Sequence, residues 1–463
     1  MISNFFNISI IYGVGFFLLR SISFLLLPLY TNLLNTNDAG IVFIVYTVLA
    51  FLNPVYAFGM DSALLKFYNS SQHSQRSVVS SSLFATICSS SLLSILLLSL
   101  SNWFSFFLNA NYNGLFFIAL ILFFDSISAR LLVLLRLQER PYYYLLIGLV
   151  NIVSSIGFNL LFLKYFSFGS FGALYALTFS AFVQFIFLAP PLIKNIKISQ
   201  LNYLLIQKMF WFGIPFLPAT ILFIITGISD RWLIKFFLGL EPVGLYGAGY
   251  KVGSAISILV LAFNLSWQPY YLKHYKSKNF KKHLNQISYI FFIILIVSTT
   301  ALCLLWPVLI KIHINNFYLI GPSFWAGGDV IPWVAFGYFF YGLFVLQTPS
   351  LYLKNKQLWS PILWCIAACS NVIINILLIP FLGFIGAGIS SLCSYLLIYL
   401  ILLYKNQKWF KNNFIDSFLI SLALSSALII VVHALLSSLV SYGLFVVYCF
   451  ICFKKIKTAV TPL

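Results

Sequence analysis

Long apolar runs, separated by short polar stretches, follow one another along almost the whole of this chain. A run of about 20 apolar residues makes a helix long enough to cross the hydrocarbon core of a bilayer. Hydrophobic residues make up 62% of the 463 residues and charged residues only 8%, whereas a soluble domain carries about 25% charged residues. Because this chain cannot cover a soluble surface with charge, we expect lipid to face most of it.

These runs predict an all-α polytopic membrane protein with about fourteen transmembrane helices. The candidate spans are 10–34, 39–60, 81–101, 114–136, 143–164, 170–192, 209–231, 243–266, 286–310, 329–351, 358–380, 385–404, 414–434 and 439–453. The first is expected to be a retained helix, because MISNFFN at the start lacks the basic segment and small-residue cleavage site of a signal peptide.

The basic residues fall mostly on one side of this predicted membrane. With the N-terminus inside, most of the 27 Lys and Arg residues lie in inner loops. The exceptions are Lys164, Arg231, Lys235 and Lys311 on the outer side, and Arg20, Arg130 and Lys251 within spans. Because basic loops stay in the cytoplasm, we expect both termini to be cytoplasmic. Topology also accounts for the net charge of +19, so nucleic acid is not an expected partner.

The two halves of the chain resemble each other at an offset of about 210 residues. The matching segments are 38–40 with 242–244, 66–68 with 273–275, 135–140 with 351–356, and 169–173 with 383–387. Six spans per half would place both halves in the membrane in the same sense, as in parallel transporter repeats. We therefore predict six-helix lobes at 1–200 and 201–405, followed by an additional helix pair at 406–463.

A series of motifs is spread over residues 10 to about 405. They are LPLYT (27–31), NDAG (37–40), GMDSALLKFY (59–68), LRLQERPYY (135–143), FGIPFLPA (212–219), SDRWLI (229–234), VGLYGAGYKVG (243–253), SWQP (266–269) and IPFLGFIGAGISSLCSYLL (379–397). In this order they resemble the polysaccharide-flippase branch of the MOP exporter superfamily. The resemblance implies two six-helix lobes around a central cavity, as in MATE transporters.

The same resemblance implies a Wzx-type flippase of the bacterial inner membrane. Such a protein carries undecaprenyl-pyrophosphate-linked oligosaccharide, with O-antigen units as the expected substrate in lipopolysaccharide biosynthesis. The implied partners are this anionic lipid-linked oligosaccharide, membrane lipids, and the polymerase and chain-length proteins of the same pathway. We expect no catalytic residue, cofactor or metal, and Cys449 and Cys452 have no second pair with which to hold a metal.

Three basic residues within spans are candidates for binding substrate in the cavity. Arg20 lies in the middle of the first predicted span, where a charge costs about 2.5–3.5 kcal/mol unless it faces protein or water. Lys251 lies among small residues of the eighth span, and Arg130 lies in the fourth. These cations would attract the substrate pyrophosphate. The alternatives are structural ion pairs, snorkelling, or close helix packing around Lys251.

Four further residues are candidates for coupling or gating. Asp125 is five positions before Arg130, about 140° around a helix, so the two are not expected to pair. Asp125 would instead pair with Arg20 or Lys251, or relay protons. Asp61 lies near Lys66 at the inner end of the second span, where the two would form a gating or structural pair or contact the substrate. Asp230 and Arg231 are expected at the outer end of the seventh span, either in the site or holding the helix end.

Other functions fit these charges less well. A MATE-like antiporter for cationic drugs would need an acidic cavity, whereas most of the deeply placed charges here are basic. A glycosyltransferase or polymerase would need a large outer loop, and none is predicted. A purely structural membrane protein would not need duplicated halves with buried charges. A flippase for another lipid-linked precursor, of the lipid II type, remains an alternative.

Overall fold

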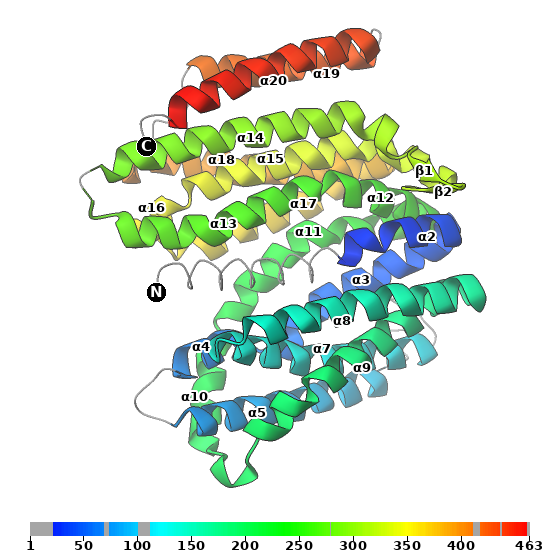
Figure 1. Cartoon of the computed structure of the whole chain (residues 1–463), viewed down its shortest axis with the longest axis vertical. Helices are drawn as coiled ribbons and strands as arrows, with labels where there is room; N and C mark the ends of the chain where they lie inside the picture. The colour runs from blue at the N-terminus through cyan, green and yellow to red at the C-terminus, as the bar shows by residue number, and fades with distance from the viewer. Residues whose placement is uncertain are drawn as a thin grey trace. The chain divides into compact units, whose positions relative to one another are not determined.

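The computed structural model describes residues 22–68, 74–100, 112–277, 279–410, 417–435 and 438–460, and these are almost entirely helical (Figure 1). Within these ranges nine helices are long and apolar enough to cross a membrane, or ten when one bent pair counts as a span. The prediction of an all-α polytopic membrane protein is confirmed. The chain forms two compact units, Met1–Ile224 and Ile225–Leu463.

The first unit contains helices that pack mainly around α7. Its elements are α2 (Leu27–Leu33), α3 (Thr36–Ala57), α4 (Met60–Tyr68), α5 (Gln75–Ser99), α7 (Tyr112–Leu137), α8 (Pro141–Asn159), the π-helical η1 (Leu160–Tyr165), α9 (Gly169–Asn195), the 3₁₀ turn η2 (Ile198–Gln200) and α10 (Tyr203–Gly213). Helix α7 packs against α3, α5 and α9, while α4 packs against α10.

Side-chain caps set the starts of several of these helices. The side chains of Asn35, Ser74 and Asn202 accept hydrogen bonds from the backbone N–H groups three residues later, at 2.7, 3.2 and 3.1 Å. Each cap satisfies a backbone donor that has no partner within its own helix. Polar residues at the ends of apolar runs therefore determine where α3, α5 and α10 begin.

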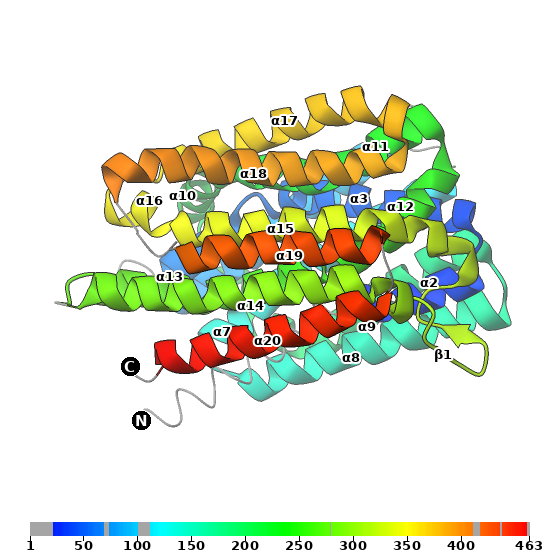
Figure 2. The ribbon, with the colours of Figure 1, turned by 90° about the horizontal axis from the view of Figure 1, so that it is seen from above.

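In the second unit α15 occupies the central position. The elements are α11 (Phe216–Leu238, which begins in the first unit), α12 (Leu240–Gly253), α13 (Ala255–His274), α14 (Phe280–Leu309), β1 (His313–Ile314), β2 (Phe317–Tyr318), the 3₁₀-helical η3 (Pro322–Val330), α15 (Ile331–Gln347), α16 (Pro349–Leu353), α17 (Trp359–Leu382), α18 (Phe384–Trp409), α19 (Ser417–Leu435) and α20 (Ser438–Val460). Helix α15 packs against α12, α13, α14 and α18 (Figure 2). The C-terminal pair α19 and α20 packs on α14 (Figure 1).

Each predicted span after the first corresponds to one helix or to two helices joined at a break. The second span is broken between α3 and α4, and the seventh between α10 and α11. The eighth is the pair α12 and α13, bent by 44°. The predicted end of the seventh span at residue 231 is wrong, because α11 continues to Leu238. Asp230 and Arg231 therefore lie inside a helix and not at its end.

One pair of matched motifs forms a similar turn in both units, whereas the repeat as a whole stays a prediction. Gly169 begins α9 with φ +57°, and Gly383 precedes α18 with φ +61°, a conformation that favours glycine. Three residues later, a Cβ on Gly172 would lie 3.0 Å from a backbone oxygen of the preceding helix, and one on Gly386 would lie 2.8 Å from another. The matched motifs thus make the same tight helix–helix junction. The lobe boundaries at 1–200, 201–405 and 406–463 stay a prediction.

Candidate functional site

In the first unit, Arg130 of α7 forms an ion pair with Asp61 of α4. The Arg130 side chain is fully buried, whereas 43% of the Asp61 side chain is exposed, and Nη1 contacts Oδ1. Nη2 donates to the carbonyl oxygen of Ala57 at 3.1 Å, and Ala57 is the last residue of α3. Arg130 therefore connects α7 to both sides of the break between α3 and α4.

This pairing differs from the pair expected from the sequence. The sequence predicts Asp61 beside Lys66, but the Lys66 ammonium lies 3.9 Å from the ring centre of Phe212, near the end of α10. The prediction of an Asp61–Lys66 pair is wrong because Asp61 faces α7 and pairs with Arg130. The Arg130 guanidinium is fully buried, so it needs a carboxylate in place of water. Lys66 instead makes a cation–π contact, which holds α4 against α10.

Asp125 lies on α7 one and a half turns before Arg130 and does not contact it. Its side chain is half-buried, and among the described residues it has neither a hydrogen bond nor an ion pair. Arg20 lies outside the described residues. The predicted pairing of Asp125 with Arg20 or Lys251, and the predicted substrate contact of Arg20, therefore stay predictions.

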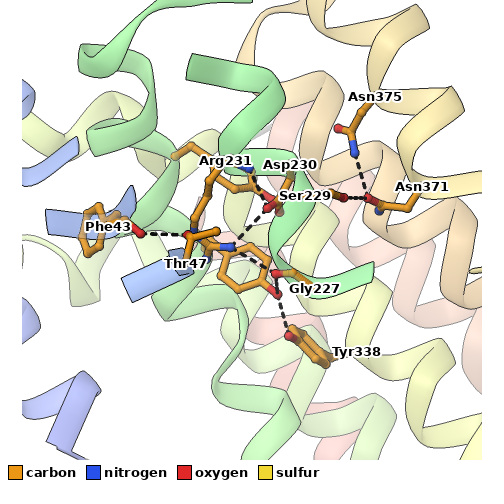
Figure 3. Close-up of polar contacts among 11 residues, drawn as sticks. Phe43, Thr47, Gly227, Ser229, Asp230, Arg231, Tyr338, Asn371 and Asn375 are labelled. Carbon is orange, nitrogen blue, oxygen red and sulfur yellow. Dashed lines mark hydrogen bonds and ion pairs between the residues drawn. The ribbon is translucent and has the colours of Figure 1, made fainter. Parts of the chain in front are cut away.

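In the second unit, Asp230 and Arg231 form a buried pair within α11 (Figure 3). Arg231 Nη1 lies 3.2 Å from Asp230 Oδ1 and also donates to the Gly227 carbonyl at 3.1 Å. The hydroxyl of Tyr246, on α12, donates to the other carboxylate oxygen of Asp230. The pair is thus satisfied inside the helix bundle, which explains how two charges are tolerated in an apolar helix.

Aromatic side chains surround the Arg231 guanidinium. Its central carbon lies 4.2 Å from the ring centre of Tyr250, a distance typical of a cation–π interaction. The Tyr250 hydroxyl is 2.6 Å from that of Tyr338 on α15. The network therefore links α11, α12 and α15 through one guanidinium and three tyrosines.

A second polar chain joins α11 to α17 and α18. Ser229 donates to the side-chain oxygen of Asn371 at 2.8 Å, and the Asn375 amide donates to the same oxygen at 2.9 Å. Ser390 donates to the Asn371 backbone carbonyl at 2.8 Å. Asn371 and Asn375 are completely buried. Figure 3 shows that this chain continues from the residue directly before Asp230.

Lys251 follows Tyr250 on α12 and is half-buried. Gly249 and Gly253 lie two residues before and two residues after Lys251, on the opposite side of α12, and they serve close packing. The role of the small residues that share the face of Lys251 stays a prediction. A Cβ on Gly249 would overlap the backbone of Gly327 in η3, and one on Gly253 would overlap Val334 in α15.

Sequence reasoning missed the tyrosines and asparagines of these networks. The pairs Tyr246–Tyr250 and Asn371–Asn375 are each four residues apart, which places the members on one helix face. Polar groups at this spacing within apolar runs are a usable signal for a buried polar network. Together with Lys251, this part of the second unit holds two basic side chains and one acidic side chain among buried hydroxyl and amide groups.

Comparisons with known proteins agree with this architecture. Residues 7–274, more than half of the chain, match the family model described as polysaccharide biosynthesis protein. An uncharacterized membrane protein of Methanocaldococcus jannaschii is 23% identical over 428 residues, which cover 87% of this chain and 83% of that protein.

Two solved structures share the fold. The lipid II flippase MurJ, in an inward closed conformation, has a TM-score of 0.73 at 17% identity and covers 98% of this chain and 100% of its own. An inward-facing multidrug resistance MATE family transporter of the MOP superfamily has a TM-score of 0.65 at 13% identity and covers 84% of this chain and 94% of its own. The fold is that of MOP-superfamily transporters, and the chain belongs to the polysaccharide biosynthesis protein family.

Proposed function

We propose that this protein is a flippase for undecaprenyl-pyrophosphate-linked oligosaccharide, namely O-antigen or similar repeat units. It acts as a transporter in the bacterial inner membrane and not as an enzyme. The observation that carries the proposal is membership of a polysaccharide biosynthesis family in a chain built from apolar helices with the fold of MOP-superfamily transporters. A polysaccharide pathway needs such a protein where its lipid-linked intermediates change leaflets.

The charges in the helices support an anionic substrate. Arg231 and Lys251 outnumber Asp230 in the second unit, and a guanidinium and an ammonium are the side chains that best bind phosphate oxygens. We assign Lys251, with Arg20, to the substrate pyrophosphate. Arg130 also stays in this proposal. Because Arg130 is paired with Asp61, binding of pyrophosphate there would require the pair to open.

The mechanism in this proposal is alternating access. The headgroup enters from the cytoplasm while the lipid tail stays in the bilayer, and rocking of the lobes exposes the headgroup to the periplasm. A membrane potential that is negative inside would favour outward movement of an anion by about 2.3 kcal/mol per charge per 100 mV. Asp125 is the candidate for ion coupling. The Asp61–Arg130 and Asp230–Arg231 pairs are the candidates for gating.

A second candidate is a flippase for a lipid II type precursor. The observation that favours it is the extent of the similarity to MurJ, which covers 98% of this chain, whereas the MATE transporter covers 84%. A drug antiporter of the MATE type is less well supported, because the excess of basic side chains around Arg231 would repel a cationic drug.

Complementation distinguishes these functions. The wild-type chain is expressed in one strain that lacks its O-antigen flippase and in another in which the lipid II flippase can be depleted. Restored surface O-antigen supports the proposed function, whereas restored growth of the depleted strain supports the second candidate. If neither strain is rescued by protein that reaches the membrane, and purified protein in liposomes does not translocate either substrate, the proposal is wrong.

Variants of Lys251 then test whether its positive charge is needed for transport. Lys251→Gln should abolish rescue, and Lys251→Arg should retain part of it because the charge remains. Lys164→Gln is the matched control, since Lys164 is an exposed lysine at the end of η1. Normal rescue by Lys251→Gln at equal membrane abundance would remove Lys251 from the substrate site.

A further inference from the structure

A cavity of about 840 Å³ lies in the second unit where α14 ends. Three basic side chains line it: Lys311, His313 and His433. Tyr442 of α20 adds a phenol. The cavity therefore lies between the end of α14, the β1–β2 hairpin and the C-terminal helix pair, apart from the Asp230–Arg231 network.

The hairpin and η3 hold the two exposed basic residues in place. The Lys311 ammonium lies 5.4 Å from the ring centre of Trp325, and the His313 ring lies 4.9 Å from that of Tyr318. Trp325 donates its indole N–H to the Ile320 carbonyl at 2.9 Å. The rings of Trp325 and Tyr318 restrict Lys311 and His313, and the hydrogen bond to the Ile320 carbonyl holds the Trp325 ring in place. Less side-chain conformational entropy is therefore lost when Lys311 and His313 bind a ligand.

His433 of α19 is one of the residues that line the cavity. Its Nδ1 is 2.8 Å from the hydroxyl oxygen of Ser441 on α20, and its ring centre is 5.6 Å from that of Tyr442. When the serine hydroxyl donates to Nδ1, the ring proton is on Nε2, which has no hydrogen bond to another described residue. This nitrogen is then a donor available to a ligand in the cavity.

The remaining lining shows which ligand fits. None of the described residues that line the cavity is acidic, and Pro307, Val308 and Ile312 supply an apolar side. Donors from a lysine, two histidines and a tyrosine suit phosphate oxygens. The apolar side suits the chains attached to that phosphate, and basic pockets between transmembrane helices bind lipid headgroups in this way.

We propose that this cavity binds the phosphate-bearing headgroup of a membrane lipid. Lys311 and His313 contact the phosphate from the hairpin, and His433 contacts it from α19. The chains of the lipid lie against α14 and the C-terminal pair. This binding belongs to the second unit alone and does not depend on which substrate the protein translocates.

Lipid binding to the full chain tests the proposal. Native mass spectrometry in detergent compares phosphatidylglycerol with diacylglycerol of the same chains, which lacks the phosphate. We expect adducts with phosphatidylglycerol only. Lys311→Gln/His433→Gln should reduce them at least about five-fold, the factor that one basic residue contributes near an anionic lipid surface. Equal adducts with diacylglycerol, or no adducts at all, would overturn the proposal.

Two further arms distinguish a lipid site from a free-anion site and from attraction by total charge. Inorganic phosphate is added as a competitor, and displacement of phosphatidylglycerol by it at millimolar concentration would show a free-anion site, which overturns the assignment to a lipid. Lys164→Gln/His274→Gln removes the same side-chain types elsewhere, since both residues are exposed. An equal loss in this control would mean that total charge, and not the cavity, attracts the lipid.

A second double variant protects the test against misfolding. Lys311→Gln/His313→Gln changes two exposed side chains and leaves the contact between His433 and Ser441 intact. It should reduce the phosphatidylglycerol adducts while its elution volume and melting temperature stay those of the wild type. Unchanged adducts in this folded variant would exclude the hairpin residues from the site.

Discussion

Arg130 and Arg231 are both buried in apolar helices, but different kinds of partner neutralise them. The partner of Arg130 is Asp61, on another helix 69 positions away. The partner of Arg231 is the adjacent Asp230, helped by the Gly227 carbonyl and the ring of Tyr250. The first arrangement joins two helices. The second is almost complete within one helix, so the two pairs should respond differently to mutation.

We predict an asymmetric response when the Asp61–Arg130 pair is broken. Asp61→Leu leaves a fully buried guanidinium without a carboxylate, which should cost about 3 kcal/mol and lower the melting temperature strongly. Arg130→Met should cost much less, because the half-exposed Asp61 carboxylate can be solvated. Melting of the purified protein in detergent, followed by intrinsic fluorescence, measures both effects.

The double variant is the control for this prediction. Asp61→Leu combined with Arg130→Met removes both charges, so its melting temperature should recover to near that of Arg130→Met alone. Additive losses would show that the two residues stabilise the protein independently, which would contradict the ion pair as the source of the effect.

Arg231 should not tolerate replacement by lysine. Arg231→Lys keeps the charge but loses the planar group that contacts Asp230, the Gly227 carbonyl and the Tyr250 ring together. We expect a loss of about 2 kcal/mol in stability, measured by the same melting assay. Tyr250→Phe is the control, because it keeps the ring beneath the guanidinium and removes only the hydroxyl bonds. A larger loss for Tyr250→Phe would contradict this account.

The sequence identified most of the buried charges but not their partners. Asp61 and Arg130 lie on different helices, so no spacing along the chain indicates that they meet. Asp230 and Arg231 were placed at a helix end because two charges are costly inside an apolar helix. Tyr246 and the Gly227 carbonyl lower that cost in the folded unit, and this compensation is visible only in three dimensions.

Among the elements, the break between α3 and α4 meets the end of α10 inside the first unit. Phe58 and Gly59 have φ values of +44° and +66°, so they cannot continue the helix. A Cβ on Gly59 would overlap the backbone of Gly213, and one on Gly213 would overlap the Phe58 carbonyl. Two broken spans thus cross with their backbones in contact, where only glycine fits.

We predict that Gly59→Ala disrupts this crossing. The added methyl must displace backbone atoms, and φ is unfavourable for alanine, so a cost of about 2–4 kcal/mol is expected. Gly157→Ala is the matched control, because a Cβ there meets nothing within 4 Å and alanine favours a helix interior over glycine. Gel filtration of fluorescent fusions should show loss of the folded peak for Gly59→Ala only. A normal folded peak for both variants would contradict the close backbone contact between Gly59 and Gly213.

The positions of the helices could be predicted from the sequence, but the breaks within them could not. Apolar runs of the right length locate spans because every backbone group in lipid must be bonded within a helix. The breaks depend on contacts such as that between Gly59 and Gly213, which no local pattern reveals. The seventh span is an example. Hydropathy predicts that it ends at residue 231, whereas α11 continues to Leu238.

At the scale of the whole molecule, the two units share more than a helical fold. The turns at Gly169 and Gly383 both have a glycine of positive φ. Three residues later, a Cβ on Gly172 or on Gly386 would lie 3.0 Å or less from backbone atoms of the preceding helix. The sequence match between 169–173 and 383–387 therefore extends to the close packing of this junction.

The orientation of the chain in the membrane gives the last prediction. Asn316 lies in the turn of the β1–β2 hairpin, and Asn355 follows α16; both are exposed and have positive φ values of +64° and +54°. The span Pro322–Leu353 separates them, so they must lie on opposite sides of the membrane. The positive-inside rule places Asn316 outside and Asn355, beside Lys354 and Lys356, inside.

Cysteine labelling measures directly on which side of the membrane each of these two positions lies. In a chain whose seven native cysteines are replaced by alanine, Asn316→Cys should react with a membrane-impermeant maleimide in intact cells. Asn355→Cys should react only after the membrane is permeabilised. Because the two positions share residue type, exposure and backbone conformation, a difference in labelling reports the side of the membrane. The reverse pattern would invert the orientation and with it the cytoplasmic termini, whereas equal labelling of both in intact cells would contradict the span between them.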